Sequence, residues 1–114
     1  MKVAVVGSRS VSDAHYDTLC RTLPIGVSTI ISGGAKGADA LAKRYAMENG
    51  LFYEEYLPDY EQYGRGAPMQ RNREIVDRAD YVIVMWDGQS RGTSYVMKYC
   101  IDSGTPVRVL ICHD

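Results

Sequence analysis

Val3-Ala4-Val5-Val6-Gly7-Ser8-Arg9-Ser10 joins a continuously apolar run to a short polar loop. Residues 3–6 are mostly β-branched, and a short run of this kind is typical of a strand buried on both faces of a parallel sheet. Gly7 ends the run, and the polar residues 8–10 follow it. The stretch therefore predicts a central strand whose carboxyl end carries a polar loop.

Similar runs occur at residues 29–31, 52–56, 81–85 and 107–111, and apolar residues recur at helical spacing between them. Strands that alternate with helices predict an α/β fold, a three-layer α/β/α arrangement around a five-stranded parallel sheet. Periodicity leaves two strand orders open, a Rossmann-like 3-2-1-4-5 and a flavodoxin-like 2-1-3-4-5. Both orders place a ligand crevice at the carboxyl ends of the strands, beside the first one.

Length and charge narrow the classes of protein to consider. The 114 residues predict one domain, residues 1–114, and no apolar run approaches the roughly 18 residues of a membrane helix. The net charge of -1 provides no overall attraction for nucleic acid. The three cysteines lack disulfide or zinc-ligand patterns, and no secretory signal is visible, so we expect a cytoplasmic protein without a metal site.

Three predicted loops after strands, residues 7–10, 32–39 and 87–93, are rich in glycine and carry cations. Main-chain N–H groups in such loops, followed by helix N-termini, suit phosphate or carboxylate, although a single glycine can also simply make a tight turn. The sequence departs from the dinucleotide-binding and P-loop patterns, so no NAD or other cofactor is predicted. The cations expected at this edge are Arg9, Lys36, Arg71, Arg73 and Arg91.

The connection at residues 57–68 is unusually long and contains two tyrosines. Tyr60 or Tyr63 could stack on a base, or both could pack on the edge of the sheet.

In this order and spacing, Gly7-Ser8-Arg9, the loop at 32–39, Arg71-Asn72 and the loop at 87–93 resemble the SLOG superfamily. This Rossmann-like group includes Smf/DprA, the LOG phosphoribohydrolases and the small single-domain YspA/YpsA-like proteins, to which the resemblance is nearest. The resemblance spans nearly the whole chain. It implies the strand order 3-2-1-4-5 and a homodimer or larger homo-oligomer, for which Tyr95 and Tyr99 would suit the contact face if they do not pack on the sheet.

The resemblance also implies a nucleotide or nucleotide-derived ligand, similar to ADP-ribose. The expected binding residues are Gly7, Ser8, Arg9, Ser32, Gly33, Gly34, Ala35, Lys36, Gly37, Asp39, Arg71, Asn72, Asp87, Gly88, Ser90, Gly92 and Thr93.

The pattern breaks where LOG enzymes carry a catalytic glutamate, because this chain has Tyr95 and Val96 there. Cleavage of an N-glycosidic bond needs a carboxylate near the cationic sugar, and the remaining catalytic candidates are Asp39 and Asp87, with Arg71. We therefore predict a module that senses, carries or sequesters a nucleotide-like metabolite. A nucleotide N-glycosidase is the alternative, and single-stranded DNA binding is the least favoured function.

Overall fold

The computed structural model describes residues 1–113 and contains a five-stranded, all-parallel sheet. The strand order is β3-β2-β1-β4-β5, so the predicted α/β/α fold and the Rossmann-like order are confirmed, and the flavodoxin-like order is excluded. β1 is central and pairs with β2 on one side and β4 on the other. The strands are β1 (Lys2–Gly7), β2 (Thr29–Ser32), β3 (Phe52–Glu55), β4 (Tyr81–Trp86) and β5 (Val107–Ile111).

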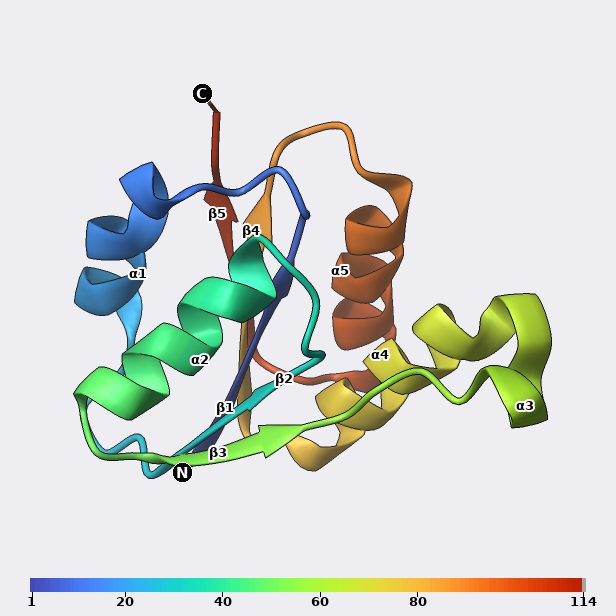
Figure 1. Cartoon of the computed structure of the whole chain (residues 1–114), viewed down its shortest axis with the longest axis horizontal. Coiled ribbons are helices and arrows are strands. Elements are labelled where there is room, and N and C mark those ends of the chain that lie inside the picture. Colours follow the sequence, from blue (N-terminus) through green and yellow to red (C-terminus); the bar gives the residue numbers. More distant parts are fainter. Residues whose placement is uncertain (114) are drawn as a thin grey trace.

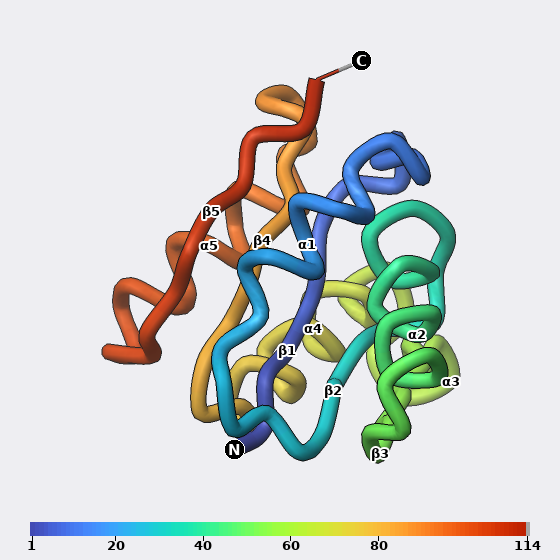
Figure 2. Tube along the Cα trace, turned by 90° about the vertical axis from the view of Figure 1, so that its left-hand side faces the viewer, coloured from blue at the N-terminus to red at the C-terminus, as the bar shows by residue number. Residues whose placement is uncertain are grey.

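Helices cover both faces of the sheet. α1 and α2 lie on one face, and α4 and α5 lie on the other (Figure 1). Figure 2 looks onto the α1 and α2 layer and places β3 and β5 at opposite edges. None of the helices within residues 1–113 has both the length and the apolar character required to cross a bilayer. The helices are α1 (Tyr16–Thr22), α2 (Ala38–Glu48), α3 (Tyr60–Tyr63), α4 (Ala67–Arg78) and α5 (Arg91–Ser103).

The side chains of β1 alternate between two buried clusters. Val3 and Val5 join the cluster under α1 and α2, whereas Ala4 and Val6 join the cluster under α4 and α5. All four are at most 5% exposed. A strand with a helical layer on each face has no solvent-facing side, which explains why its sequence is apolar without interruption.

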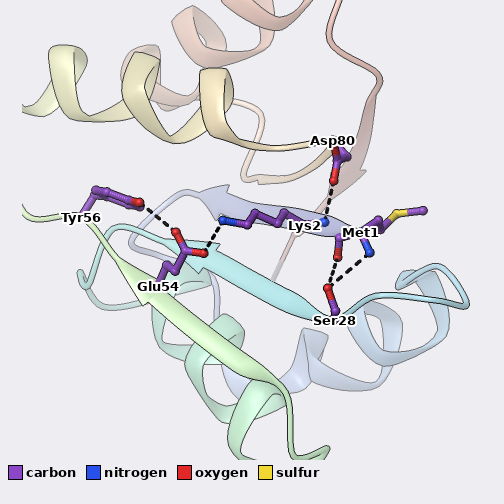
Figure 3. A network of polar contacts seen from close by, with 6 residues as sticks. All are labelled: Met1, Lys2, Ser28, Glu54, Tyr56 and Asp80. Carbon is purple, nitrogen blue, oxygen red and sulfur yellow. Dashed lines mark hydrogen bonds and ion pairs between the residues drawn. The ribbon is translucent and has the colours of Figure 1, made fainter.

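Polar contacts at the start of β1 join this strand to both sides of the sheet (Figure 3). The Lys2 ammonium reaches across β2 to the Glu54 carboxylate on β3, at 2.8 Å, and the Tyr56 hydroxyl donates to the same carboxylate, also at 2.8 Å. The Lys2 backbone N–H donates to Asp80, just before β4, at 2.7 Å. Exposed pairs contribute little singly, but together these contacts link β1 to both of its flanks.

The segment expected as a long connection is partly helical. It contains α3 and a 3₁₀ turn at Gly64–Gly66, and α4 begins at Ala67. Asp59 caps α3 by accepting the Gln62 N–H at 3.1 Å. Four residues are too few to show a helical period, so the sequence pattern indicated only a loop here. In Figure 1, α3 lies beyond α4, on the side away from the sheet.

Candidate functional site

A cavity of about 340 Å³ lies at the carboxyl edge of the sheet, beside the end of β1. The loop after β1, the start of α2, the first turns of α4 and the first turns of α5 form its walls, as expected for a Rossmann-like crevice. Its lining residues are Val6, Gly7, Ser8, Arg9, Ala35, Asp39, Pro68, Arg71, Asn72, Ser90, Gly92, Thr93 and Val96.

Two glycines allow the chain segments around the cavity to come together. A Cβ at Gly7 would overlap the Met85 carbonyl on β4, whose oxygen accepts the Ser8 N–H at 2.9 Å. Gly37 has φ of +78°, and a Cβ there would lie 2.5 Å from the Ser8 carbonyl oxygen and 2.6 Å from that of Arg9. The loops after β1 and β2 therefore pack backbone against backbone, which only glycine permits.

A small group of hydroxyls lines the α5 side of the cavity. The Ser8 hydroxyl is 3.3 Å from that of Thr93, which in turn donates to the Ser90 hydroxyl at 3.1 Å. Ser90 is the N-cap of α5 and also accepts the Thr93 N–H at 3.4 Å. This network positions three hydroxyls around the positive end of a 13-residue helix.

Gly92 leaves that helix end open. A Cβ at Gly92 would meet no atom within 4 Å, and its backbone is not left-handed, so neither packing nor conformation requires a glycine. Within residues 1–113 the Gly92 N–H has no hydrogen-bond acceptor. A ligand oxygen can therefore approach the first turn of α5 closely.

The half-buried Arg71 guanidinium is held by backbone oxygens. One Nη donates to the Gly33 carbonyl at 2.8 Å and to the Tyr56 carbonyl at 3.3 Å, and Nε donates to Asn72 Oδ1 at 2.9 Å. Burial lowers the pKa of Arg71, and the nearby Asp39 carboxylate opposes that shift. A Cβ at Gly33 would lie 2.6 Å from this Nη, so Gly33 makes room for the cation.

Among residues 1–113, Asp39 is the one acidic residue that lines the cavity, and it is buried. Burial raises its pKa above the usual value, although the Ala35 N–H, which donates to Oδ2 at 3.1 Å, and the positive charge of Arg71 oppose the shift. Asp39 is thus a carboxyl group whose ionisation costs free energy in the folded chain.

We expect Asp39→Asn to stabilise the protein at neutral pH. Because the pKa of Asp39 is raised in the folded state, its contribution to stability is fully present below the ordinary value of 3.8 and is lost as the pH rises through the folded-state pKa. The amide removes this loss while keeping an acceptor for Ala35. Urea denaturation across pH should show the variant more stable at pH 7 and the difference vanishing toward pH 3; an equal difference at both pH values would contradict the assignment.

Asp87, the second carboxylate considered as a catalytic candidate, does not line the cavity. Its Oδ1 accepts the N–H groups of Ser90 and Gln89, at 2.8 and 2.9 Å, and its Oδ2 accepts the Ser10 hydroxyl at 2.8 Å. The Ser90 and Gln89 N–H groups, followed by the Ser10 hydroxyl, lower the pKa of Asp87 to about 2. A carboxylate held in this way fixes the loop before α5 and is a poor proton donor.

Most of the binding residues predicted from the sequence line this cavity. The predicted residues that line it are Gly7, Ser8, Arg9, Ala35, Asp39, Arg71, Asn72, Ser90, Gly92 and Thr93. The predicted residues outside its lining are Ser32, Gly33, Gly34, Lys36, Gly37, Asp87 and Gly88. Val6, Pro68 and Val96 also line the cavity and were not predicted. Pro68 lies three and four residues before Arg71 and Asn72, and this helical spacing was the available signal.

Of the five cations expected to converge, two line the cavity and three do not. Arg9 and Arg71 line the cavity, whereas Lys36 and Arg91 are exposed outside it. Arg73 lies over the Tyr99 ring, 5.7 Å from its centre, in a different groove between α4 and α5.

The two tyrosines considered for an oligomer contact have different surroundings. Tyr99 is partly buried among the α4 and α5 side chains and donates to Asp77 at 2.7 Å. Tyr95 is 58% exposed. Packing therefore explains Tyr99 but not Tyr95, and the homo-oligomer stays a prediction.

Comparisons with known proteins identify the family to which this chain belongs. Residues 1–63 match the family model described as the YspA, cpYpsA-related SLOG family. The chain is 35% identical, over 118 aligned positions, to the gene 61 protein of Mycobacterium phage D29, and the alignment covers 93% of each protein. No solved structure matches the chain. The family match and the full-length similarity, together with the glycine-rich loops around β1, show that this chain belongs to the YspA and cpYpsA-related SLOG family.

Proposed function

We propose that the cavity binds a nucleotide or nucleotide-derived metabolite through its phosphate, and that the chain acts as a sensor, carrier or sequestering module. One observation carries the proposal: hydroxyls, an open helix N-terminus and two arginines meet in a single cavity. Phosphate oxygens accept hydrogen bonds from each of these groups, and guanidinium forks match phosphate geometry.

The charges around the cavity favour one orientation of such a ligand. Gly92 and Thr93 bring the positive end of α5 to one side, and the loop after β1 contributes the exposed Arg9. Asp39 repels a phosphate but accepts hydrogen bonds from ribose hydroxyls. We therefore expect the phosphate near α5 and Arg9, and the ribose near Asp39, whose negative charge is offset by that of Arg71.

The size of the cavity also limits how much of a ligand it encloses. About 340 Å³ is near the lower end of the roughly 300–1,000 Å³ typical of ligand sites. That space suits a nucleoside monophosphate. Of an ADP-ribose-like ligand, one nucleotide half would occupy the cavity and the other would extend into solvent.

Calorimetric titration with AMP and ADP-ribose tests the proposal. We expect saturable binding by the wild-type protein, with Arg9→Ala about 10- to 100-fold weaker, since a charged hydrogen bond contributes about 1.5–3 kcal/mol. Gly92→Ala should weaken binding as well, because its methyl group enters the space beside the helix end, while leaving the fold intact. Arg21→Ala, which removes an exposed cation from α1, should bind normally.

Two results would count against a phosphate site here: an absence of saturable binding to either compound, or equal affinities for the wild-type, Arg9→Ala and Gly92→Ala proteins. Thermal denaturation of each variant separates lost binding from lost folding.

Asp39 favours a second candidate function, hydrolysis of the N-glycosidic bond of a nucleotide. Its buried carboxyl with a raised pKa lies in the same cavity, where a carboxylate stabilises a cationic sugar or positions water. Release of adenine from AMP by the wild-type protein, and its loss in Asp39→Asn, would establish this activity. Intact AMP after prolonged incubation at high protein concentration would leave binding as the function.

A further inference from the structure

Asn72 is a cavity residue whose amide orientation is fixed by its neighbour. Arg71 Nε donates to Asn72 Oδ1 at 2.9 Å. A guanidinium N–H can only donate, so the amide atom that faces it is the oxygen, and the amide nitrogen lies at the other end of the side chain. Within residues 1–113, Asn72 Nδ2 donates to no protein acceptor. Asn72 therefore keeps both of its N–H donors available for another molecule.

The Asn72 side chain belongs to the face of α4 that borders the cavity. Pro68, Arg71 and Asn72 recur at spacings of three and four residues, which places them on one side of the helix, and all three line the cavity. Asn72 is half-buried, whereas the adjacent Arg73 is exposed and lines the separate groove between α4 and α5. The unused donors of Asn72 therefore belong to the wall of the nucleotide cavity.

Asp39 provides an acceptor from another wall of the same cavity. It lies in the first turn of α2, which covers the opposite face of the sheet from α4 (Figure 1). Its Oδ2 accepts the Ala35 N–H at 3.1 Å, and a carboxyl group can accept several further hydrogen bonds. Arg71 lies between the two walls. A Cβ at Gly33 would lie 2.6 Å from Arg71 Nη1 and 3.0 Å from Asp39 Oδ2, while Arg71 Nε holds Asn72.

An acceptor and a donor placed in this way suit the hydroxyls of a sugar. A hydroxyl donates one hydrogen bond and accepts others, so ribose hydroxyls can donate to the Asp39 carboxylate while their oxygens accept from Asn72 Nδ2. A phosphate oxygen accepts only, and the charge of Asp39 would repel it. The pair is therefore complementary to the ribose of a nucleotide and not to its phosphate.

We propose that Asp39 and Asn72 together bind the vicinal 2′- and 3′-hydroxyls of the ligand, so that the cavity selects nucleotides in which both hydroxyls are unmodified. This inference rests on the proposed function and deepens it, because phosphate binding alone does not distinguish one sugar from another. It makes the ligand class a ribonucleotide with an open diol, and it disfavours nucleotides whose diol is esterified or absent.

Titration of the full chain with AMP and 2′,3′-dideoxy-AMP tests the diol site. The wild-type protein should bind AMP about 10- to 100-fold more tightly, because the dideoxy sugar provides no partner for the carboxylate or the amide. Asn72→Ala should weaken AMP about 2- to 10-fold and leave the affinity for 2′,3′-dideoxy-AMP unchanged. The unchanged affinity for the dideoxy compound also shows that the variant is folded.

Two control variants separate sugar binding from other effects. Gln70→Ala removes an amide from the same helix, but from the separate hollow that Gln70 shares with Tyr63, and it should retain both affinities. Arg9→Ala should weaken both compounds equally, because its partner is the phosphate. If the wild-type protein binds the two compounds equally, or if Asn72→Ala weakens both in parallel, the diol site is wrong while the phosphate site stands. If the wild-type protein binds neither compound, the proposed function fails and this inference fails with it.

Discussion

Gly37→Ala is expected to lower the free energy of unfolding by about 3 kcal/mol or more, the largest single loss of stability that we predict. Two costs add at this position. Gly37 has φ of +78° and ψ of -126°, a conformation that residues with a Cβ rarely adopt and that costs about 1–3 kcal/mol. The new Cβ would also lie within 2.6 Å of two backbone carbonyl oxygens, and forced overpacking costs about 1–3 kcal/mol more. Urea denaturation measures the sum.

Alanine substitutions at two other glycines measure the conformational cost and the packing cost separately. Gly50 has φ of +63° but open space around it, so Gly50→Ala should show only the conformational cost, about 1–2 kcal/mol. Gly92 has neither constraint, and Gly92→Ala should be neutral or stabilising by up to about 1 kcal/mol. If Gly37→Ala is no more destabilising than Gly50→Ala, the backbone contact between the loops after β1 and β2 does not hold the cavity together.

The sequence was informative about the fold because a strand buried on both faces has to be apolar at every position. Residues 3–6 and 81–85 have this property, since helices cover both faces of β1 and β4. Strand order is different. β1 lies between β2 and β4, and this follows from how the crossovers pass over the sheet, which the apolar pattern of an individual strand does not record. The order became predictable only through the family resemblance.

The site was predictable to the level of its loops, but the roles of individual residues were less so. Glycine has a different role at each of two positions. Gly37 allows two backbone segments to touch, whereas Gly92 leaves space at a helix end. Asp39 and Asp87 present the same ambiguity. Burial in the cavity makes ionisation of Asp39 costly, and turn N–H groups make Asp87 a constraint on its loop. These differences arise from three-dimensional surroundings that residue type and spacing do not reveal.

We expect Arg71 to contribute both to the stability of the fold and to the binding of the ligand. Its guanidinium joins the loop after β2 to the chain after β3 through the Gly33 and Tyr56 carbonyls, and its charge lies near Asp39. In the opposite direction, the Tyr56 hydroxyl bonds to Glu54, which the Lys2 ammonium also holds (Figure 3). The cation therefore sits at the junction of the sheet edge and the cavity, so we expect its loss to affect both.

Arg71→Met should destabilise the protein by about 2–3 kcal/mol and weaken AMP binding about 10- to 100-fold, because charged hydrogen bonds contribute about 1.5–3 kcal/mol and every 1.4 kcal/mol is tenfold in affinity. Methionine keeps an apolar stem of similar length, so the loss reflects the guanidinium rather than a cavity. Denaturation in urea and calorimetry on the same preparation measure the two effects.

Combining Arg71→Met with Asp39→Asn distinguishes the two roles of the cation. Without Arg71 the Asp39 carboxylate is buried with less compensating positive charge, so its pKa rises further and part of the lost stability is the cost of that charge. The amide removes this cost, and the double variant should therefore be more stable at neutral pH than Arg71→Met alone. Its affinity for AMP should stay low, because the amide restores no donor for the ligand. If stability and affinity recover together, Arg71 only neutralises Asp39 and does not contact the ligand; if neither changes, the two side chains are not coupled.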